Sequence, residues 1–223
     1  MTLHHIGQAE LRVDLDEQSF FDVCNIARGV FHPIHSFLDR DNFLSVAFDY
    51  KLTSGEFFPF PISLDLGMLA PGVESYSIKN LLLYWNGESI GYIEVHEIFD
   101  VDRWQISEKL YGTVDIAHPG VKELTSHSGP LLGGTVILEN KFLEMHSKRY
   151  MTPETVIHEF QSRGWKKVVG FATRNVPHRG HEFLLKKNVI NADGLLIQPT
   201  VAQKEGGKYT EKAIRLSFEY LIE

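Results

Sequence analysis

The stretch of residues 166–188, KKVVGFATRNVPHRGHEFLLKKN, constrains the fold of this chain more than any other segment. Its first part, Val168 to Phe171, is short, β-branched and mostly apolar, which predicts a strand covered on both faces. Its last part, Glu182 to Lys187, contains good helix formers with an apolar stripe, which predicts a helix. The polar turn between them therefore lies where a strand ends and a helix begins.

This turn, residues 173–181, has the properties of an anion-binding site. Backbone N–H groups at a helix N-terminus point outward, and the helix dipole there favours negative charge. His178 and His181 are three residues apart, so they share a face of the first helical turn and can donate to phosphate oxygens. Gly180 has no Cβ and lets a ligand approach the backbone, and Arg174 offers a planar fork for an oxyanion. The alternative is a polar strand-to-helix loop with surface histidines.

The segment TRNVPHRGHE resembles the signature of the ATP sulfurylase (sulfate adenylyltransferase) family, Q-T-R-N-P-x-H-R-x-H-E. That family belongs to the nucleotidyltransferases with a paired-histidine motif. The resemblance implies that His178 and His181 bind nucleotide phosphates and stabilise charge on the α-phosphate. It also implies that Thr173 and Asn175 contact the nucleotide and that Arg174 holds the sulfate. The substrates it implies are ATP, with Mg²⁺ bound to the nucleotide, and sulfate.

The chain departs from this signature at one anion-binding position, where Ala172 replaces the family's Gln. That Gln helps to hold sulfate in the family. A methyl group cannot donate a hydrogen bond, so we expect the anion to bind more weakly here, by about 1–3 kcal/mol. Sulfate remains the leading acceptor, giving adenylyl sulfate and pyrophosphate. The alternatives are a phosphonate or carboxylate acceptor, or a nucleotide other than ATP.

Other segments carry the same resemblance more weakly, among them residues 57–66 and 118–136. The resemblance implies an α+β, β-barrel-like (PUA-like) domain over residues 1–150. It implies an α/β Rossmann-like nucleotidyltransferase domain over residues 151–223, incomplete at its C-terminal end. The family's catalytic domain continues into a second phosphate-binding motif, G-R-D-H-A-G, which does not follow here. The missing motif has three explanations: the chain is shortened, a second chain completes the domain, or the chain is a non-catalytic subunit.

The N-terminal pattern predicts helices first and then strands. One helix covers residues 17–30, and a second short helix starts at Asp41. From 51 to 138 the pattern predicts short strands and turns. The clearest element is a hairpin over residues 81–95, because two apolar runs flank Asn86-Gly87, the strongest short hairpin signal.

The C-terminal pattern predicts a β-α-β unit with parallel strands and a right-handed crossover. Thr152-Pro153 starts a helix that leads into the strand at 168. Its inward-facing residues are Val156, Ile157 and Phe160. The second strand covers residues 195–198, and a ligand is expected off the carboxyl ends of both strands. Thr210 caps a last helix, whose apolar stripe is Ile214, Phe218 and Leu221.

Several isolated residues have two interpretations each. His32 and His35 indicate a loop packed on the core, with a metal site as the alternative. His118 precedes a proline and is therefore extended; it shapes a turn or contacts substrate. Lys204 and Lys208 flank a glycine pair and either touch phosphate or lie in a solvated loop.

The charge balance argues against non-specific nucleic-acid binding. The chain has 223 residues and a formal net charge of -7, which makes it a poor candidate for nucleic-acid binding. Its one cysteine, Cys24, excludes an internal disulfide and indicates buried filler rather than a nucleophile. No stretch resembles a signal peptide or approaches the roughly 20 apolar residues that cross a membrane. We therefore expect a cytoplasmic homo-oligomer, or a chain that a second chain completes, without nucleic-acid or membrane partners.

Overall fold

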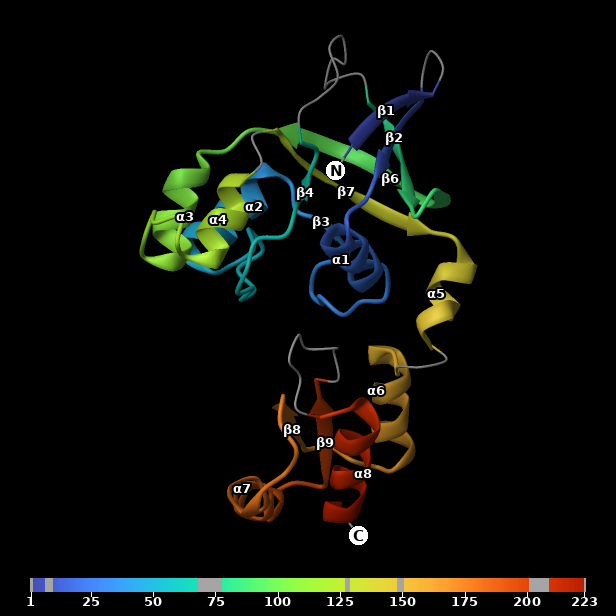
Figure 1. Ribbon diagram of the computed structural model, residues 1–223, viewed down its shortest axis with the longest axis vertical. Helices are drawn as coiled ribbons and strands as arrows, with labels where there is room; N and C mark the ends of the chain where they lie inside the picture. The colour runs from blue at the N-terminus through green and yellow to red at the C-terminus, as the bar shows by residue number, and fades with distance from the viewer. Residues whose placement is uncertain are drawn as a thin grey trace. The chain divides into compact units, whose positions relative to one another are not determined.

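The computed structural model describes residues 2–6, 10–67, 78–126, 129–147, 151–200 and 209–222. The chain divides into two compact units, Met1–Pro153 and Glu154–Glu223 (Figure 1). Each unit combines a sheet with helices, so the chain is a mixed α/β protein.

The first unit is built on a seven-stranded sheet. Its strands are β1 (Thr2–Ile6), β2 (Glu10–Asp14), β3 (Ser36–Phe37), β4 (Leu64–Asp65), β5 (Asn80–Trp85), β6 (Glu88–Phe99) and β7 (Leu131–Leu138). Within the described residues the order is β1-β2-β5-β6-β7-β3, and β4 also pairs with β7. The β2–β5 pair is parallel, and the other pairs of this sheet are antiparallel.

The predicted hairpin is confirmed as β5 and β6. Asn86 and Gly87 form its turn with φ angles of 51° and 81°, the left-handed values that two-residue hairpin turns require. Leu81 and Leu83 of β5 and Ile93 of β6 are fully buried. The hairpin therefore contributes to the hydrophobic core between the sheet and α1.

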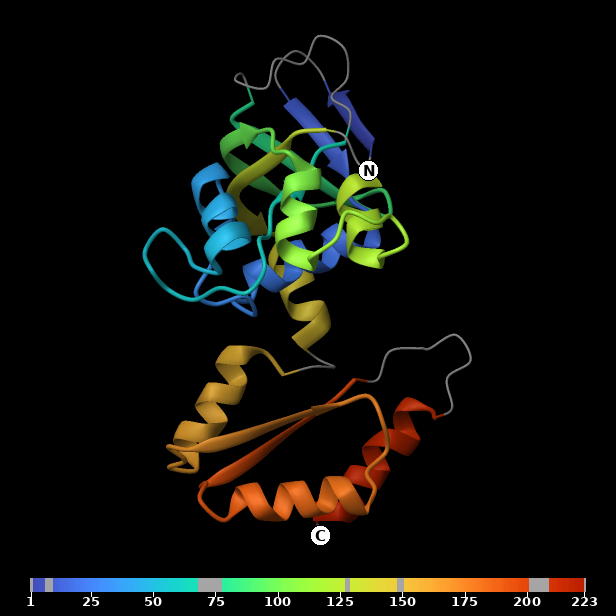
Figure 2. The same ribbon diagram turned by 90° about the vertical axis from the view of Figure 1, so that its left-hand side faces the viewer.

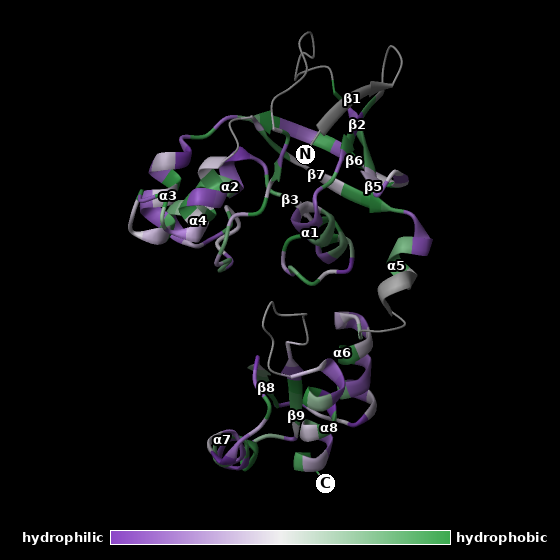
Figure 3. Cartoon of the chain, in the orientation of Figure 1, coloured by the Kyte–Doolittle hydropathy of each residue, from purple (hydrophilic) through white to green (hydrophobic). Residues whose placement is uncertain are grey.

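The helices of the first unit are α1 (Glu17–Ala27), α2 (Arg40–Asp49), α3 (Arg103–Tyr111), α4 (Pro119–Ser126) and α5 (Asn140–Ser147). Helix α1 packs on the sheet through an apolar face, which Figure 3 shows in green. Phe20 of this face stacks on Trp85 of β5, with ring centroids 4.5 Å apart. Cys24 lies on the same face and is 1% exposed, which confirms its role as buried filler.

Two predictions for this unit were wrong. Helix α2 starts at Arg40 rather than Asp41, because the Asp39 carboxylate accepts a hydrogen bond from the Asn42 N–H at 2.9 Å and caps the helix. The stretch from 51 to 138 contains two helices, α3 and α4, as well as strands. Asp102 caps α3 by accepting from the N–H groups of Trp104 and Gln105, and Pro119 occupies the first position of α4, which proline favours.

Three histidines with two interpretations each, His32, His35 and His118, lie in the first unit. His32 and His35 are exposed and flank the buried Ile34, so this loop packs on the core. The described residues contain no group of three or more side chains placed to hold a metal ion. His118 closes a turn by donating its N–H to Asp115 O at 2.9 Å, and its ring lies 4.9 Å from that of Tyr111.

The second unit contains α6 (Pro153–Ser162), β8 (Val168–Thr173), α7 (Arg179–Val189), β9 (Gly194–Pro199) and α8 (Glu211–Ile222). The two strands run side by side in Figure 2 and pair in parallel from Val168–Gly194 to Thr173–Pro199, as predicted. The Thr210 hydroxyl accepts from the Ala213 N–H at 3.2 Å, which confirms the predicted cap of α8.

Helix α7 begins at Arg179, directly after its N-cap residue His178. One detail of this unit differs from the prediction. Ile157 of α6 is 53% exposed instead of facing inward. Lys204 and Lys208 lie outside the described residues. Among the described helices, none is long and apolar enough to cross a membrane.

Candidate functional site at the start of helix α7

Thr173 fixes the end of β8 and the start of the polar turn. Its carbonyl oxygen accepts from the Thr200 N–H at 2.7 Å, just beyond the end of β9. Its hydroxyl accepts from the Asn175 N–H at 3.2 Å. The chain therefore leaves the sheet at a defined position, and Arg174 and Asn175 follow as exposed residues.

His178 caps α7 with its own ring. Its backbone is extended, and its Nδ1 accepts from the Gly180 N–H at 3.1 Å. Its carbonyl oxygen accepts from the Glu182 N–H, also at 3.1 Å. A ring nitrogen that accepts a hydrogen bond carries no proton, so the neutral ring has its proton on Nε2. His178 is exposed and so offers Nε2–H as a donor to a ligand.

Gly180 makes room for this cap. A Cβ at position 180 would lie 3.0 Å from Cε1 and 3.1 Å from Nδ1 of His178. The sequence predicts that the missing Cβ lets a ligand approach; in the structure a Cβ at this position would crowd the His178 ring, which would have to shift by a few tenths of an ångström.

His181 stacks on His178, and the sequence spacing predicted that the two share a face. The ring centroids are 3.8 Å apart and the ring planes differ by 23°. The edge-on ring of Phe171 in β8 lies 5.3 Å away and supports His181 from the sheet. Nδ1 of His181 is buried and has no hydrogen-bond partner in the described part of the chain. The two imidazoles thus face the same side of the turn.

Basic side chains follow the histidines along α7. Arg179 occupies the first helical position, and Lys186 pairs with Glu182 one turn away. The hydrogen bond and positive charge of Lys186, followed by the charge of Arg179, lower the pKa of Glu182. With Arg174 ahead of the helix, this part of an acidic chain is locally positive, which suits an anion.

Ala172, the departure from the family signature, lies beside a residue that the sequence did not single out. The register pairs Ala172 of β8 with Gln198 of β9. Paired residues in a sheet point to the same face, and both side chains are exposed. Only the strand register reveals this neighbour, because 25 residues separate the two positions along the chain.

The fold and this turn define a mixed α/β protein with a candidate anion site at a helix N-terminus. A family model described as a PUA-like domain matches residues 3–141, and a model described as ATP-sulfurylase matches residues 147–223. The chain belongs to the ATP sulfurylase family, as a PUA-like domain followed by an ATP-sulfurylase domain segment.

Curated relatives support this membership. The chain is 35% identical over 203 residues to the sulfate adenylyltransferase of Hyperthermus butylicus, covering 90% of this chain and 51% of the relative. It is 33% identical over 216 residues to that of Ignicoccus hospitalis, covering 96% and 56%. It is 34% identical over 212 residues to that of Pyrococcus abyssi, covering 95% and 55%. The chain therefore spans about half the length of these relatives.

A solved structure shares the fold. The hexameric APS kinase from Thiobacillus denitrificans matches with a TM-score of 0.59 and 20% sequence identity, over 93% of this chain and 38% of that one.

Proposed function

We propose that this chain takes part in adenylyl transfer from ATP to sulfate, which forms adenylyl sulfate and pyrophosphate. The observation that carries the proposal is the stacked pair of His178 and His181 at the N-terminus of α7, directly after β8. The names of the curated relatives agree with this reaction. In this proposal residues 1–150 form a PUA-like barrel, and residues 151–223 belong to a Rossmann-like catalytic domain.

Positioning and electrostatics perform the reaction in this proposal. Arg174 holds the acceptor oxyanion, one oxygen of which attacks the α-phosphorus of ATP in line. The bond between the α-phosphorus and the oxygen that bridges to the β-phosphate breaks, and pyrophosphate leaves with both electrons. His178 donates through Nε2, and His181 beside it faces the same phosphate oxygens, so both offset the charge that builds on the α-phosphate. Thr173 and Asn175 hold the turn against the nucleotide.

Mg²⁺ bound to the nucleotide would supply further neutralisation of charge. The described residues contain no cluster of three metal-ligating side chains.

Gln198 supplies the amide that Ala172 lacks. Its side chain lies beside Ala172 on the same face of the sheet, at the carboxyl ends of the strands where ligands bind in parallel α/β sheets. The amide of Gln198 on β9 can thus donate to the anion that the family's Gln, at the position of Ala172 on β8, helps to hold. Sulfate therefore remains the preferred acceptor over a phosphonate or a carboxylate.

A second candidate is a sulfurylase-like subunit that becomes active only with a partner chain or in a homo-oligomer. One observation favours it: the β8–β9 sheet has two strands within the described residues. Two parallel strands alone are too few to bury both faces of a sheet.

The decisive experiment measures binding of ATP with Mg²⁺, and sulfate-dependent pyrophosphate release, by the 223-residue chain. His178→Ala and His181→Ala should each reduce nucleotide affinity, while His158→Ala on the exposed face of α6 should not. His178→Asn adds a control, because Asn caps helices well and preserves α7 but lacks the imidazole donor. Unchanged nucleotide affinity in His178→Asn and His181→Ala would rule out the proposed roles.

The same assay separates the two candidates. Pyrophosphate release by the purified chain alone supports direct catalysis. Release that appears only after a full-length sulfate adenylyltransferase carrying an inactivated histidine pair is added supports the subunit hypothesis.

A further inference from the structure

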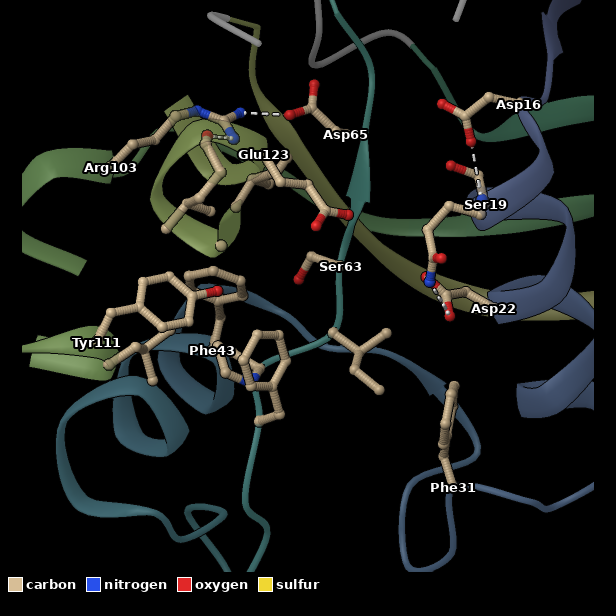
Figure 4. A pocket seen from close by; sticks show the side chains of 18 residues that line it. Asp16, Ser19, Asp22, Phe31, Phe43, Ser63, Asp65, Arg103, Tyr111 and Glu123 are labelled. Atoms are coloured by element: carbon tan, nitrogen blue, oxygen red, sulfur yellow. Dashed lines mark hydrogen bonds and ion pairs between the residues drawn. The ribbon is translucent and has the colours of Figure 1, made fainter. Parts of the chain in front are cut away.

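A cavity of about 420 Å³ opens in the first unit, far along the chain from the histidine turn. Helices α1, α2, α3 and α4 and the segment that leads into β4 contribute its walls (Figure 4). All the lining residues lie between positions 16 and 131, so this site belongs to the first unit alone. Its volume lies within the range of about 300–1,000 Å³ that is typical of small-molecule sites.

The one basic side chain among the lining residues is already neutralised. Arg103 Nη2 lies 2.8 Å from an oxygen of Asp65, and both side chains are mostly buried. The same guanidinium donates to the carbonyl oxygens of Leu124 at 3.1 Å and Gly129 at 2.7 Å. Arg103 therefore has a structural role and leaves no positive charge to attract an anion.

Three further carboxylates line the cavity, and none of them has a cationic partner among the described residues. Asp16 caps α1 by accepting from the Ser19 N–H at 2.8 Å, and the two oxygens of Asp22 accept long hydrogen bonds from Gln18 Nε2 at 3.3 and 3.4 Å. Glu123 forms no ion pair or side-chain hydrogen bond with any described residue, and its carboxylate points into the cavity in Figure 4. Burial raises the pKa of Asp22, and the nearby charges of Asp16 and Glu123 raise it further against the opposing effect of Gln18.

Aromatic rings form the opposite wall. Phe31, Phe43, Phe60 and Tyr111 line it. The Tyr111 ring packs directly against α4, since a Cβ at Gly120 would lie 2.6 Å from its Cζ. Burial, followed by the charge of Glu123, raises the pKa of Tyr111, so its hydroxyl stays protonated at neutral pH.

We propose that this cavity binds a small organic cation, an amine or guanidinium that carries an apolar group. The carboxylates of Asp22 and Glu123 pair with the charge, and the aromatic wall provides cation–π and apolar contacts. A metal ion fits less well, because the carboxylates form no cluster of three ligands among the described residues. ATP and sulfate are repelled by the same carboxylates, so the site is separate from the proposed adenylyl-transfer site.

The test measures thermal stabilisation of the 223-residue chain and ligand affinity by calorimetry, using phenethylamine as the probe. Phenethyl alcohol and phenylpropionate are the matched ligand controls, because they keep the ring and replace the ammonium by a neutral or a negative group. The amine should stabilise the chain and bind, the alcohol should bind more weakly, and the acid should not bind.

The variants locate the binding site. Glu123→Gln should lower the amine affinity by at least about tenfold, because charged hydrogen bonds contribute more than neutral ones. Phe60→Leu should lower it by a smaller factor, since the ring is lost while the apolar volume is largely kept. Glu108→Gln is the control, because Glu108 is exposed on α3 and does not line the cavity.

Three results would overturn the proposal. One is equal binding of the amine and the alcohol, and another is an unchanged amine affinity in Glu123→Gln. The third is the absence of binding by the free amine while a lysine-containing peptide binds, because that would make the cavity a protein-docking site. None of these measurements depends on adenylyl transfer.

Discussion

Ala172 and Gln198 pair across the parallel ladder of β8 and β9, with both side chains exposed at the end of the strands. The family signature places an amide at the first of these positions, and this chain carries one at the second. The two positions are therefore neighbours on one face of the sheet, and we propose that either strand can provide the donor that holds the acceptor anion.

This relationship predicts a rescue. Gln198→Ala should weaken sulfate binding by about 1–3 kcal/mol, the cost of leaving a polar partner unpaired. Adding Ala172→Gln to that variant should restore most of the affinity, because the donor returns on the neighbouring strand. Sulfate titration in the presence of a non-hydrolysable ATP analogue measures both effects.

Gln161→Ala, on the exposed surface of α6, is the control for this series and should bind sulfate normally. If Gln198→Ala binds sulfate like the unmodified chain, Gln198 has no role in holding the acceptor, although the histidine pair can still bind the nucleotide.

Gly180→Ala tests the geometry of the histidine turn. The added methyl group would lie 3.0 Å from His178 Cε1 and would displace the ring. We expect nucleotide affinity to fall, but by less than the roughly hundredfold that a misplacement of about 1 Å in a functional group can cost, because the ring needs to shift by less than that. Alanine is a better helix former than glycine, so the stability of α7 should not fall.

Gly170→Ala in β8 is the matched substitution, because nothing lies within 4 Å of a Cβ at that position. It should leave nucleotide affinity unchanged. A Gly180→Ala chain with unchanged nucleotide affinity would mean that the orientation of the His178 ring does not matter for binding.

Asp193 ties the turn before β9 to the start of β8. Its carboxylate accepts from the N–H groups of Lys166 and Lys167, both at 2.8 Å, and these bonds lower its pKa below the ordinary value of 3.8. The stabilisation is therefore present above pH 3.8 and is lost as the pH falls through the lower pKa of the folded state.

We expect Asp193→Asn to speed hydrogen exchange of the Lys166 and Lys167 amides at neutral pH. The difference from the unmodified chain should shrink at acidic pH, because protonated Asp193 is then as uncharged as the Asn that replaces it. Asp100→Asn, at an exposed position in the first unit, should not affect these amides. A difference that persists unchanged into strong acid would show that the charge of Asp193 is not the cause.

The Arg103–Asp65 pair should contribute strongly to the stability of the first unit. Its side chains are 11% and 17% exposed, so Arg103→Ala leaves a mostly buried carboxylate without its cation. We expect a loss of about 3 kcal/mol in the free energy of unfolding. Arg215→Ala removes an exposed ion pair with Glu219 and should cost about 0.5 kcal/mol or less. Urea unfolding measures both losses. Equal losses of unfolding free energy in Arg103→Ala and Arg215→Ala would contradict the stronger contribution of the buried pair.

The sequence predicted those turns and helix caps that depend on residues close together along the chain. The Asn86-Gly87 turn, the Thr210 cap and the His178–His181 spacing each depend on residues a few positions apart. Helix α3 was missed because its sequence, RWQISEKLY, is largely polar and buries only Ile106 and Ser107. Helix α4 could have been predicted from Pro119, because proline favours the first position of a helix.

Features that depend on tertiary pairing were not accessible from the sequence. The parallel β2–β5 pair joins segments about 70 residues apart, and nothing in either strand specifies its partner. The register that places Gln198 beside Ala172 follows from the pairing of two strands across α7. The cavity of the first unit brings together side chains from four helices and from the segment before β4.

We propose that the paired imidazoles at the start of α7 bind the phosphates of a nucleotide. This binding can be followed through the ring ¹⁵N resonances of His178 and His181 while ATP with Mg²⁺ is added to the chain. We expect both rings to shift together along one saturating curve, with His178 protonated on Nε2, while His158 stays unchanged. Saturating nucleotide binding that leaves the rings of His178 and His181 unperturbed would contradict it.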